Sequence, residues 1–259
     1  MYDINFEQFS NTLKNINIEK KGTLPESLKL FDTGKLSSYY APFDYINKQA
    51  KVVICGITPG MQQAVLALEE AKAKLNNGHS LTNAKLAAKE TASFGGPMRA
   101  NLIRMLDNIG LPEKLGIQSA ADLFGSRKDL VHYTSALRYP IFVNGKNYSG
   151  TPSMLKTPIL KQMVDDCLAN EVQQLSPETL FIPLGSKVEE VLRYLVKREV
   201  LREQQLLSGM PHPSGANAER ISYFLGEKEK HLLSIKTNPD IIDTSKAQIL
   251  RTISGLQLL

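Results

Sequence analysis

The chain has 259 residues, of which 42% are hydrophobic, so it can bury a substantial core and lies near the upper size for one domain. No internal repeat, low-complexity tract or Pro/Ser-rich linker divides it, so we expect a single domain over residues 1–259. Lysine and arginine together number 31, against 26 aspartate and glutamate residues, and the net charge of +5 favours a polyanionic partner.

Cysteine placement and hydropathy argue against several other classes of protein. Cys55 and Cys167 lie far apart and form no CxxC motif, which argues against a disulfide framework or a zinc or iron–sulfur site. The amino terminus (MYDINFE) lacks the basic and apolar regions of a signal peptide, and no apolar run approaches membrane-spanning length. We therefore expect a cytoplasmic monomer with no membrane partner.

Apolar runs alternate with segments of helical periodicity along the chain. The predicted strands are residues 51–55, about 130–136, 178–184 and 205–210. The predicted helices are residues 61–75, 97–109, 157–174 and 186–199. This alternation predicts an α/β fold with helices on both faces of a short, largely parallel sheet. Flanking helical segments are expected at residues 1–46 and about 230–259.

Two short loops follow predicted strands and carry the residues best suited to bind a ligand. The first is GITPG at residues 56–60, and the second is PHPSGAN at residues 211–217. Ligands of open α/β sheets bind at the carboxyl ends of the strands, where we expect both loops to lie. Proline fixes the backbone and glycine permits its close approach to a ligand, while only His212 brings ready proton or anion chemistry.

Three further segments lie between these loops and extend the pattern. FGGP at residues 94–97 precedes LIRML at 102–106, TSALRYP occupies 134–140, and FIPLG occupies 181–185. In this order, with the two loops, the motifs resemble those of the uracil-DNA glycosylase superfamily. The resemblance covers residues 51–217 and implies a three-layer α/β/α sandwich with a short, largely parallel central sheet.

The resemblance implies a monofunctional DNA glycosylase, which hydrolyses the N-glycosidic bond of a flipped-out base and leaves an abasic site. The sugar becomes oxocarbenium-like and the base leaves as an anion, so the site must stabilise negative charge and place a water. The target nucleotide must also leave the duplex. DNA is the expected partner. No cofactor is expected because no nucleotide-binding glycine motif occurs, and the four histidines lack metal-ligand spacing, so no metal site is predicted.

The resemblance assigns roles to the reacting groups. His212 would hydrogen-bond the departing base, and a loop histidine that caps a turn is the alternative. Thr58 stands where relatives position the attacking water. Phe94 would present its ring to the flipped base, with a core phenylalanine as the alternative. The predicted base pocket comprises Gly56, Ile57, Pro59, Gly60, Met61, Phe94, Ser135, Asn144 and Asn147.

A second set of residues is predicted to bind the DNA backbone. Ser214, together with the backbone N–H groups of Gly215 and Asn217, would hold a phosphate beside the lesion. A plain turn motif is the alternative. The predicted DNA-binding residues are Pro213, Ser214, Gly215 and Asn217.

Three positions depart from the pattern of active relatives. Thr58 replaces the Asp or Asn that positions water, and a hydroxyl cannot act as an anionic base. Ser135 occupies the approximate place where several relatives have an Asn that reads the Watson–Crick edge of uracil, so that bidentate contact is lost. Ala216 and Asn217 follow the His-Pro-Ser-Gly sequence where many relatives insert a leucine-like wedge into the base stack, and alanine is too small to wedge.

These departures favour a modified pyrimidine larger than uracil. Bacterial glycosylases that excise glucosylated hydroxymethylcytosine from phage DNA belong to the same superfamily, so the resemblance extends to a hypermodified phage base and to a role in antiphage defence. Two alternatives stay open, a conventional uracil or deaminated-base repair glycosylase and a non-catalytic nucleic-acid-binding protein that retains the fold.

Two groups of residues have a structural alternative to their functional role. Asn144, Asn147 and Tyr148 offer donors and acceptors to a base pocket, or else form a solvated Gly/Asn turn. An aromatic group before the first predicted strand roofs the site or belongs to the core. It consists of Tyr39, Tyr40, Phe43 and Tyr45.

Overall fold

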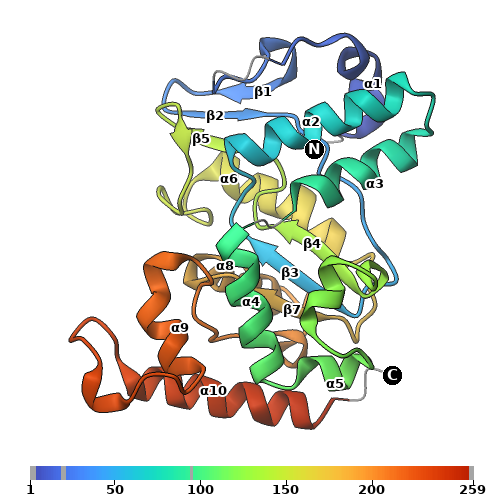
Figure 1. Ribbon diagram of the computed structural model, residues 1–259. Coiled ribbons are helices and arrows are strands. Elements are labelled where there is room, and N and C mark those ends of the chain that lie inside the picture. The colour runs from blue at the N-terminus through green and yellow to red at the C-terminus, as the bar shows by residue number, and fades with distance from the viewer. Residues whose placement is uncertain (1–3, 19–21, 94–95, 257–259) are drawn as a thin grey trace. The chain divides into compact units, whose positions relative to one another are not determined.

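The computed structural model describes residues 4–18, 22–93 and 96–256 (Figure 1). Contacts group the chain into two compact units, each assembled from three segments. The first unit comprises Met1–Ile46, Gly56–Ser93 and Tyr133–Gln174, and the second comprises Asn47–Cys55, Phe94–His132 and Leu175–Leu259. The single domain expected from the sequence stays a prediction.

A three-stranded parallel sheet contains the strands predicted near residues 51–55, 130–136 and 178–184. Its order is β4-β3-β7, with bounds Val131–Ser135, Val52–Gly56 and Leu180–Pro183. β3 pairs with β7 in parallel register from Val52 opposite Leu180 to Cys55 opposite Pro183. All four of these β3 residues are buried, and so is all of β7. Continuous apolar runs of this kind are typical of parallel strands, and the prediction of these three strands is confirmed.

The fourth predicted strand, at residues 205–210, is wrong. Leu206 makes a single parallel bridge with Phe181, and the Leu207 N–H donates to the Phe181 carbonyl at 2.9 Å. Gln205 instead ends a 3-10 turn, and its side-chain amide donates to the Thr179 carbonyl at 3.0 Å. Gly209 has φ +99, which breaks the extended backbone.

The four predicted helices are present, with one interruption. α2, α4 and α8 span Met61–Asn76, Gly96–Asn108 and Ser186–Lys197. The segment predicted at 157–174 is divided into α6 (Pro158–Met163), a π-helical turn (Val164–Ala169) and α7 (Asn170–Val172). The other helices are α1 (Phe6–Asn15), α3 (Leu81–Ala92), α5 (Leu111–Leu115), α9 (Ala218–Phe224) and α10 (Pro239–Ser254). Short 3-10 turns occupy Glu26–Leu28, Ala120–Phe124, Lys128–Leu130, Glu203–Gln205, Gly215–Asn217 and Lys230–Leu232.

A second, antiparallel sheet belongs to the first unit. Its order is β1-β2-β5-β6, with bounds Lys29–Asp32, Leu36–Tyr39, Ile141–Val143 and Lys146–Asn147. The expectation of helix throughout residues 1–46 is therefore right for α1 and wrong for the β1–β2 hairpin. The hairpin turns at Gly34, which has φ +81 and whose N–H donates to the Asp32 side chain at 2.8 Å. The fold is mixed α/β, with one parallel and one antiparallel sheet.

The aromatic group before β3 is divided between core and half-buried positions. Tyr40 is fully buried and stacks on Phe9, with ring centroids 4.1 Å apart, and Phe43 is also buried. The core alternative is therefore right for these two, while Tyr39 and Tyr45 are half-buried. Within the described ranges, none of the helices combines the length and apolar character needed to cross a bilayer.

The core of the first unit contains a buried ion pair. Arg138 Nη2 lies 2.6 Å from Glu171 Oε2, and only 1% of the Glu171 side chain is exposed. The same guanidinium donates to the Cys167 carbonyl of the π-helical turn at 3.0 Å. Each buried charge thus has a partner, and removing one charge leaves the other uncompensated.

We expect Glu171→Gln to lower the free energy of unfolding by about 3 kcal/mol, because Arg138 then stays buried without a counter-charge. Urea denaturation measures the change. Asp165→Asn is the control, since the Lys161–Asp165 pair is partly exposed and should contribute less than about 1 kcal/mol. Equal losses in the two variants would contradict the role given to the buried pair.

Candidate active site

The loop that follows β3 lies beside the end of β4 in the first unit. The Ala136 N–H donates to the Gly56 carbonyl at 2.8 Å, and the Leu137 N–H donates to the Ile57 carbonyl at 2.9 Å. Ser135, the half-buried last residue of β4, precedes these two donors. The structure therefore brings Gly56 and Ile57 beside the segment that begins at Ser135, and their role in a base pocket stays a prediction.

Thr58 joins this loop to the segment before β5. Its hydroxyl donates to the Tyr139 carbonyl at 2.9 Å and accepts from the Ile141 N–H at 3.3 Å. A threonine hydroxyl has one proton and two lone pairs, so one lone pair remains for an incoming water. Thr58 has a structural task first, and its role in placing water stays a prediction.

The start of α2 is fixed by two side chains. The Gly60 N–H donates to Gln63 Oε1 at 3.0 Å, and the Met61 N–H donates to Asn147 Oδ1 at 3.0 Å. A Cβ on Gly60 would lie 3.3 Å from Asn147 Nδ2, so glycine permits this close contact. Asn147, Gly60 and Met61 are therefore neighbours, and Asn147 satisfies one of the first N–H groups of the helix.

Asn144 occupies the turn between β5 and β6. It has φ +48, Gly145 has φ +73, and both residues are exposed. Two successive positive φ values at Asn-Gly are typical of a tight hairpin turn. The turn alternative is therefore right for Asn144. The Phe94 prediction lies outside the described residues, and the Pro59 side chain is buried within its loop.

His212 belongs to the second unit, where its ring is held by its own loop. The Ser214 N–H donates to His212 Nδ1 at 3.2 Å. Because Nδ1 accepts a hydrogen bond, the proton of the neutral ring resides on Nε2. Burial lowers the pKa of His212, which favours this neutral form. The ring is thus a neutral donor through Nε2.

Gly185, which follows β7, makes room for this ring. Its φ is +94, and a Cβ at this position would lie 3.1 Å from His212 Cδ2. Both the backbone conformation and the space therefore favour glycine here. On the other side of the loop, Asn101 Nδ2 of α4 donates to the Pro213 carbonyl at 2.9 Å. Gly185, at the end of the FIPLG segment, therefore lies against the His212 ring of the PHPSGAN loop.

The predicted phosphate-binding turn is also internally hydrogen-bonded. Asn217 Nδ2 donates to Ser214 Oγ at 3.1 Å, and the Asn217 N–H donates to the Ser214 carbonyl at 2.9 Å. Ser214 Oγ accepts in that bond, so its own proton is not consumed by it. Gly215 lies between them in a 3-10 turn. Residues 214–217 therefore form a hydrogen-bonded turn, and whether this turn also binds a phosphate stays a prediction.

Sequence reasoning missed Arg220 and Asn101. Arg220 Nη1 donates to Asn217 Oδ1 at 2.7 Å and adds a positive charge beside the turn. The signal for it is the three-residue spacing from Asn217 at the start of α9, which places both on one helix face. No local pattern indicates Asn101, because its partner Pro213 is 112 residues away in the sequence.

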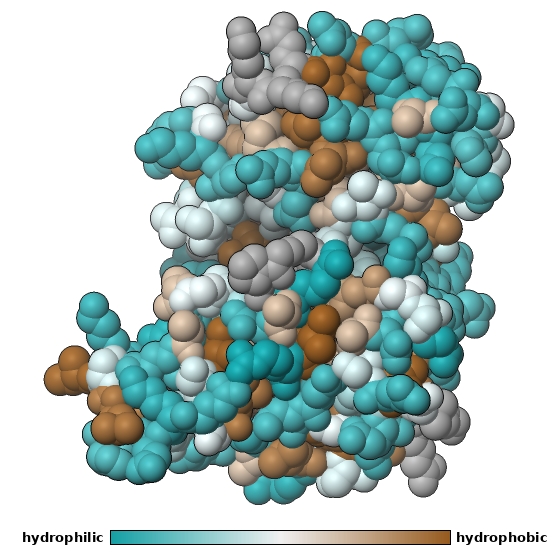
Figure 2. Space-filling view, in the orientation of Figure 1, coloured by the Kyte–Doolittle hydropathy of each residue, from teal (hydrophilic) through white to brown (hydrophobic). Residues whose placement is uncertain are grey.

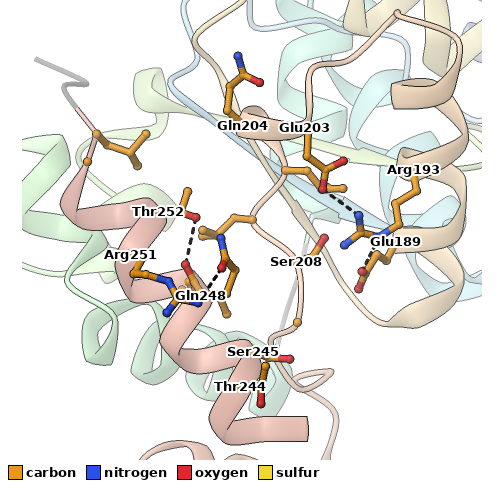
Figure 3. Close-up of a pocket in the computed structure, with 16 residues that line it drawn as sticks. Glu189, Arg193, Glu203, Gln204, Ser208, Thr244, Ser245, Gln248, Arg251 and Thr252 are labelled. Atoms are coloured by element: carbon orange, nitrogen blue, oxygen red, sulfur yellow. Dashed lines mark hydrogen bonds and ion pairs between the residues drawn. The ribbon is translucent and has the colours of Figure 1, made fainter.

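A separate cavity of about 730 Å³ lies in the second unit between residues 203–209 and α10 (Figure 3). Among its charged groups, Arg193 contacts Glu189 and Glu203, each at 2.9 Å, and Arg251 donates to Gln248 Oε1 at 2.8 Å. Ser208 Oγ is buried there without a hydrogen-bond partner. None of the described site residues predicted from sequence lines this cavity, and it is distinct from the His212 loop.

Comparisons place this mixed α/β protein in a family. The chain is 38% identical over 229 residues to the uncharacterized protein YoxB of Bacillus subtilis (strain 168), covering 88% of this chain and 90% of that protein. The chain belongs to the family of YoxB. No protein-family model and no solved structure matches it.

The geometry of Thr58 predicts that Thr58→Val lowers the free energy of unfolding by about 1–3 kcal/mol, because the Tyr139 carbonyl and the Ile141 N–H lose their partner. Thr58→Ser keeps the hydroxyl and is the matched control. Thermal and urea unfolding of both variants measure the difference. A valine variant as stable as the serine variant would show that these two hydrogen bonds do not hold the loop.

The His212 loop predicts a neutral imidazole with its proton on Nε2 and a pKa below the usual 6.5. The ¹⁵N chemical shifts of the ring, followed by NMR from pH 8 downward, report the tautomer and the titration. Titration of His212 above 6.5, or a proton on Nδ1, would contradict this arrangement.

Proposed function

We propose that the protein is a monofunctional DNA glycosylase of the uracil-DNA glycosylase type, with the corresponding three-layer α/β/α architecture. The observation that carries the proposal is the neutral His212 ring, held through Nδ1 by the Ser214 N–H and offering Nε2–H as a donor. A turn that carries the Ser214 hydroxyl and the Asn217 amide follows immediately in the chain.

The proposed reaction uses His212 on the leaving base. As the N-glycosidic bond breaks, negative charge develops on the base, and a donor already in place stabilises it without reorganising. A neutral imidazole is suited to this step because burial disfavours its cationic form. Water completes the hydrolysis at the anomeric carbon and the free base and abasic site are the products.

The proposed DNA contact uses the turn that follows. Ser214 offers its hydroxyl proton to a phosphate oxygen, and the Arg220 guanidinium supplies positive charge beside Asn217. Such contacts position the backbone and carry no base sequence information. Phosphate contacts of this kind can form with either duplex or single-stranded DNA.

We propose a modified pyrimidine larger than uracil as the target base, for example glucosylated hydroxymethylcytosine in phage DNA. Ser135 is half-buried at the end of β4, and serine lacks the side-chain amide that would form two hydrogen bonds with uracil. Asn147 is committed to Met61 through its oxygen, which leaves the side-chain N–H₂ group as a donor for a ligand substituent. Conventional repair of uracil is the less favoured alternative.

A second candidate function is nucleic-acid binding without hydrolysis. The observation that favours it is Thr58, whose hydroxyl already donates to the Tyr139 carbonyl. No carboxylate or amide stands at that position to orient the attacking water. This candidate keeps the DNA contacts and removes the reaction.

We expect His212→Ala to lower the rate of base release by roughly a hundredfold while DNA affinity changes little, because one preorganised donor is lost. Single-turnover assays on DNA carrying uracil or glucosylated hydroxymethylcytosine, followed by alkaline cleavage of abasic sites, measure the rate. His231→Ala is the matched control, since this histidine is exposed and pairs with Glu229, away from the His212 loop in sequence.

The outcomes separate the candidates. Faster release of uracil than of the larger base by the wild-type protein would favour conventional repair. Release by His212→Ala at the wild-type rate would remove His212 from the mechanism. Binding without release from any DNA would favour the non-catalytic candidate.

A further inference from the structure

A tight turn between α9 and α10 exposes an isoleucine at its apex. The Thr237 N–H donates to the Ser234 carbonyl at 3.0 Å, so Ile235 and Lys236 are the two central residues of a four-residue turn. Ile235 is fully exposed, with a relative exposure of 104%. Figure 2 shows hydrophobic side chains protruding at the surface over this segment. An apolar, β-branched residue at such a position gains nothing from folding.

One carboxylate holds both ends of this turn. Glu219 of α9 accepts from the Ser234 hydroxyl at 2.6 Å, from the Ser234 N–H at 3.1 Å and from the Thr237 hydroxyl at 2.5 Å. Lys228 Nζ adds an ion pair at 2.8 Å, and these bonds hold the pKa of Glu219 well below its usual value. The exposed isoleucine therefore sits on a fixed turn.

The turn is also tied to the predicted phosphate-binding residues. Arg220 donates through Nη1 to Asn217 Oδ1 at 2.7 Å and through Nη2 to the Lys236 carbonyl at 3.0 Å. A single guanidinium group thus bridges the turn and the His-Pro-Ser-Gly loop. Ile235 is the residue next to Lys236, so it lies close to where the proposed DNA backbone would be held.

The chemistry around the apex fits nucleic acid. Lys236 is the exposed neighbour of Ile235, whereas Lys230 of the same connection forms an ion pair with Asp240 at 2.7 Å. Proteins that kink DNA insert apolar side chains such as isoleucine between base steps while flanking cations contact phosphates. A fixed turn that carries one apolar and one basic residue side by side has both features.

We propose that Ile235 inserts into the base stack of duplex DNA next to the nucleotide held by the His212 loop, and that Lys236 contacts a phosphate. The inference rests on the proposed function, because it takes the Ser214–Asn217 turn to hold the backbone.

The experiment uses a duplex oligonucleotide with a tetrahydrofuran abasic analogue and 2-aminopurine as the adjacent base, whose fluorescence rises when it unstacks. Wild-type protein should bind and raise the fluorescence. Ile235→Ser should abolish the rise and weaken binding about tenfold, because the apolar contact is lost. Ile235→Leu should keep both effects. Leu250→Ser, at a partly exposed position on α10, is the matched control and should behave as wild type.

Salt dependence tests the second contact. Lys236→Gln should lower the slope of log Kd against log salt concentration by about one, because one phosphate contact is removed. An unchanged slope would remove Lys236 from the interface. Anionic phosphatidylglycerol vesicles provide the competing arm, and Ile235-dependent binding to vesicles but not to the duplex would overturn the DNA proposal in favour of a membrane surface.

Three outcomes separate this inference from the proposed reaction. Base release with wild-type fluorescence in Ile235→Ser overturns the inference alone. An Ile235-dependent fluorescence rise without base release from any DNA overturns the reaction alone and keeps the insertion. A wild-type protein that binds the duplex without any rise, or does not bind it, overturns the insertion.

Discussion

The parallel pairing of β3 with β7 fixes where both strands end. Cys55 lies opposite Pro183, and the Leu184 N–H donates to the Cys55 carbonyl at 2.8 Å, so the hydrogen bonding continues one residue past the end of β7. Gly185 then leaves the sheet with a positive φ and contacts the His212 ring. The position of that ring therefore depends on a fully buried backbone ladder, which is among the most rigid parts of a protein.

Helix α9 connects the His212 loop to the turn at Ile235 although it has only seven residues. Two consecutive residues near its start, Glu219 and Arg220, make hydrogen bonds to both. The carboxylate accepts from both ends of the turn, while the guanidinium spans from Asn217 to the Lys236 carbonyl. Charge-assisted hydrogen bonds are stronger and more directional than neutral ones. A short helix can thereby hold two loops in place without a large apolar core of its own.

The sequence predicted the elements whose signal is local. Continuous apolar runs identified three buried strands, and helical spacing identified α2, α4 and α8. The strand predicted at residues 205–210 was wrong for two reasons. Gln205 ends a 3-10 turn and bonds the Thr179 carbonyl through its side-chain amide, and Gly209 turns the chain with a positive φ. The β1–β2 hairpin was missed because its strands have four residues each and because β2 also pairs with β5, more than 100 residues away.

The candidate site shows the same division between local and distant information. The turn at Asn144 and the motif around His212 could be read from neighbouring letters. The hydrogen bonds of Thr58 could not, because Tyr139 and Ile141 are more than 80 residues from it. The polarity of Asn147 predicts a place in the base pocket. Its hydrogen bond to the start of α2 depends on the β5–β6 hairpin, which no periodicity of the sequence indicates.

The hydrogen bond between Ser214 and His212 also couples protonation to loop structure. A protonated imidazole is a donor at both nitrogens, so Nδ1 could no longer accept the Ser214 N–H. Protonation would therefore remove the bond that orders the first residues of the phosphate-binding turn. Since burial lowers the pKa of His212, the neutral ring and the ordered turn are stabilised together above that pKa and are lost together as the pH falls through it. The same constraint that keeps Nε2–H available for a leaving base thus keeps Ser214 in place for its phosphate.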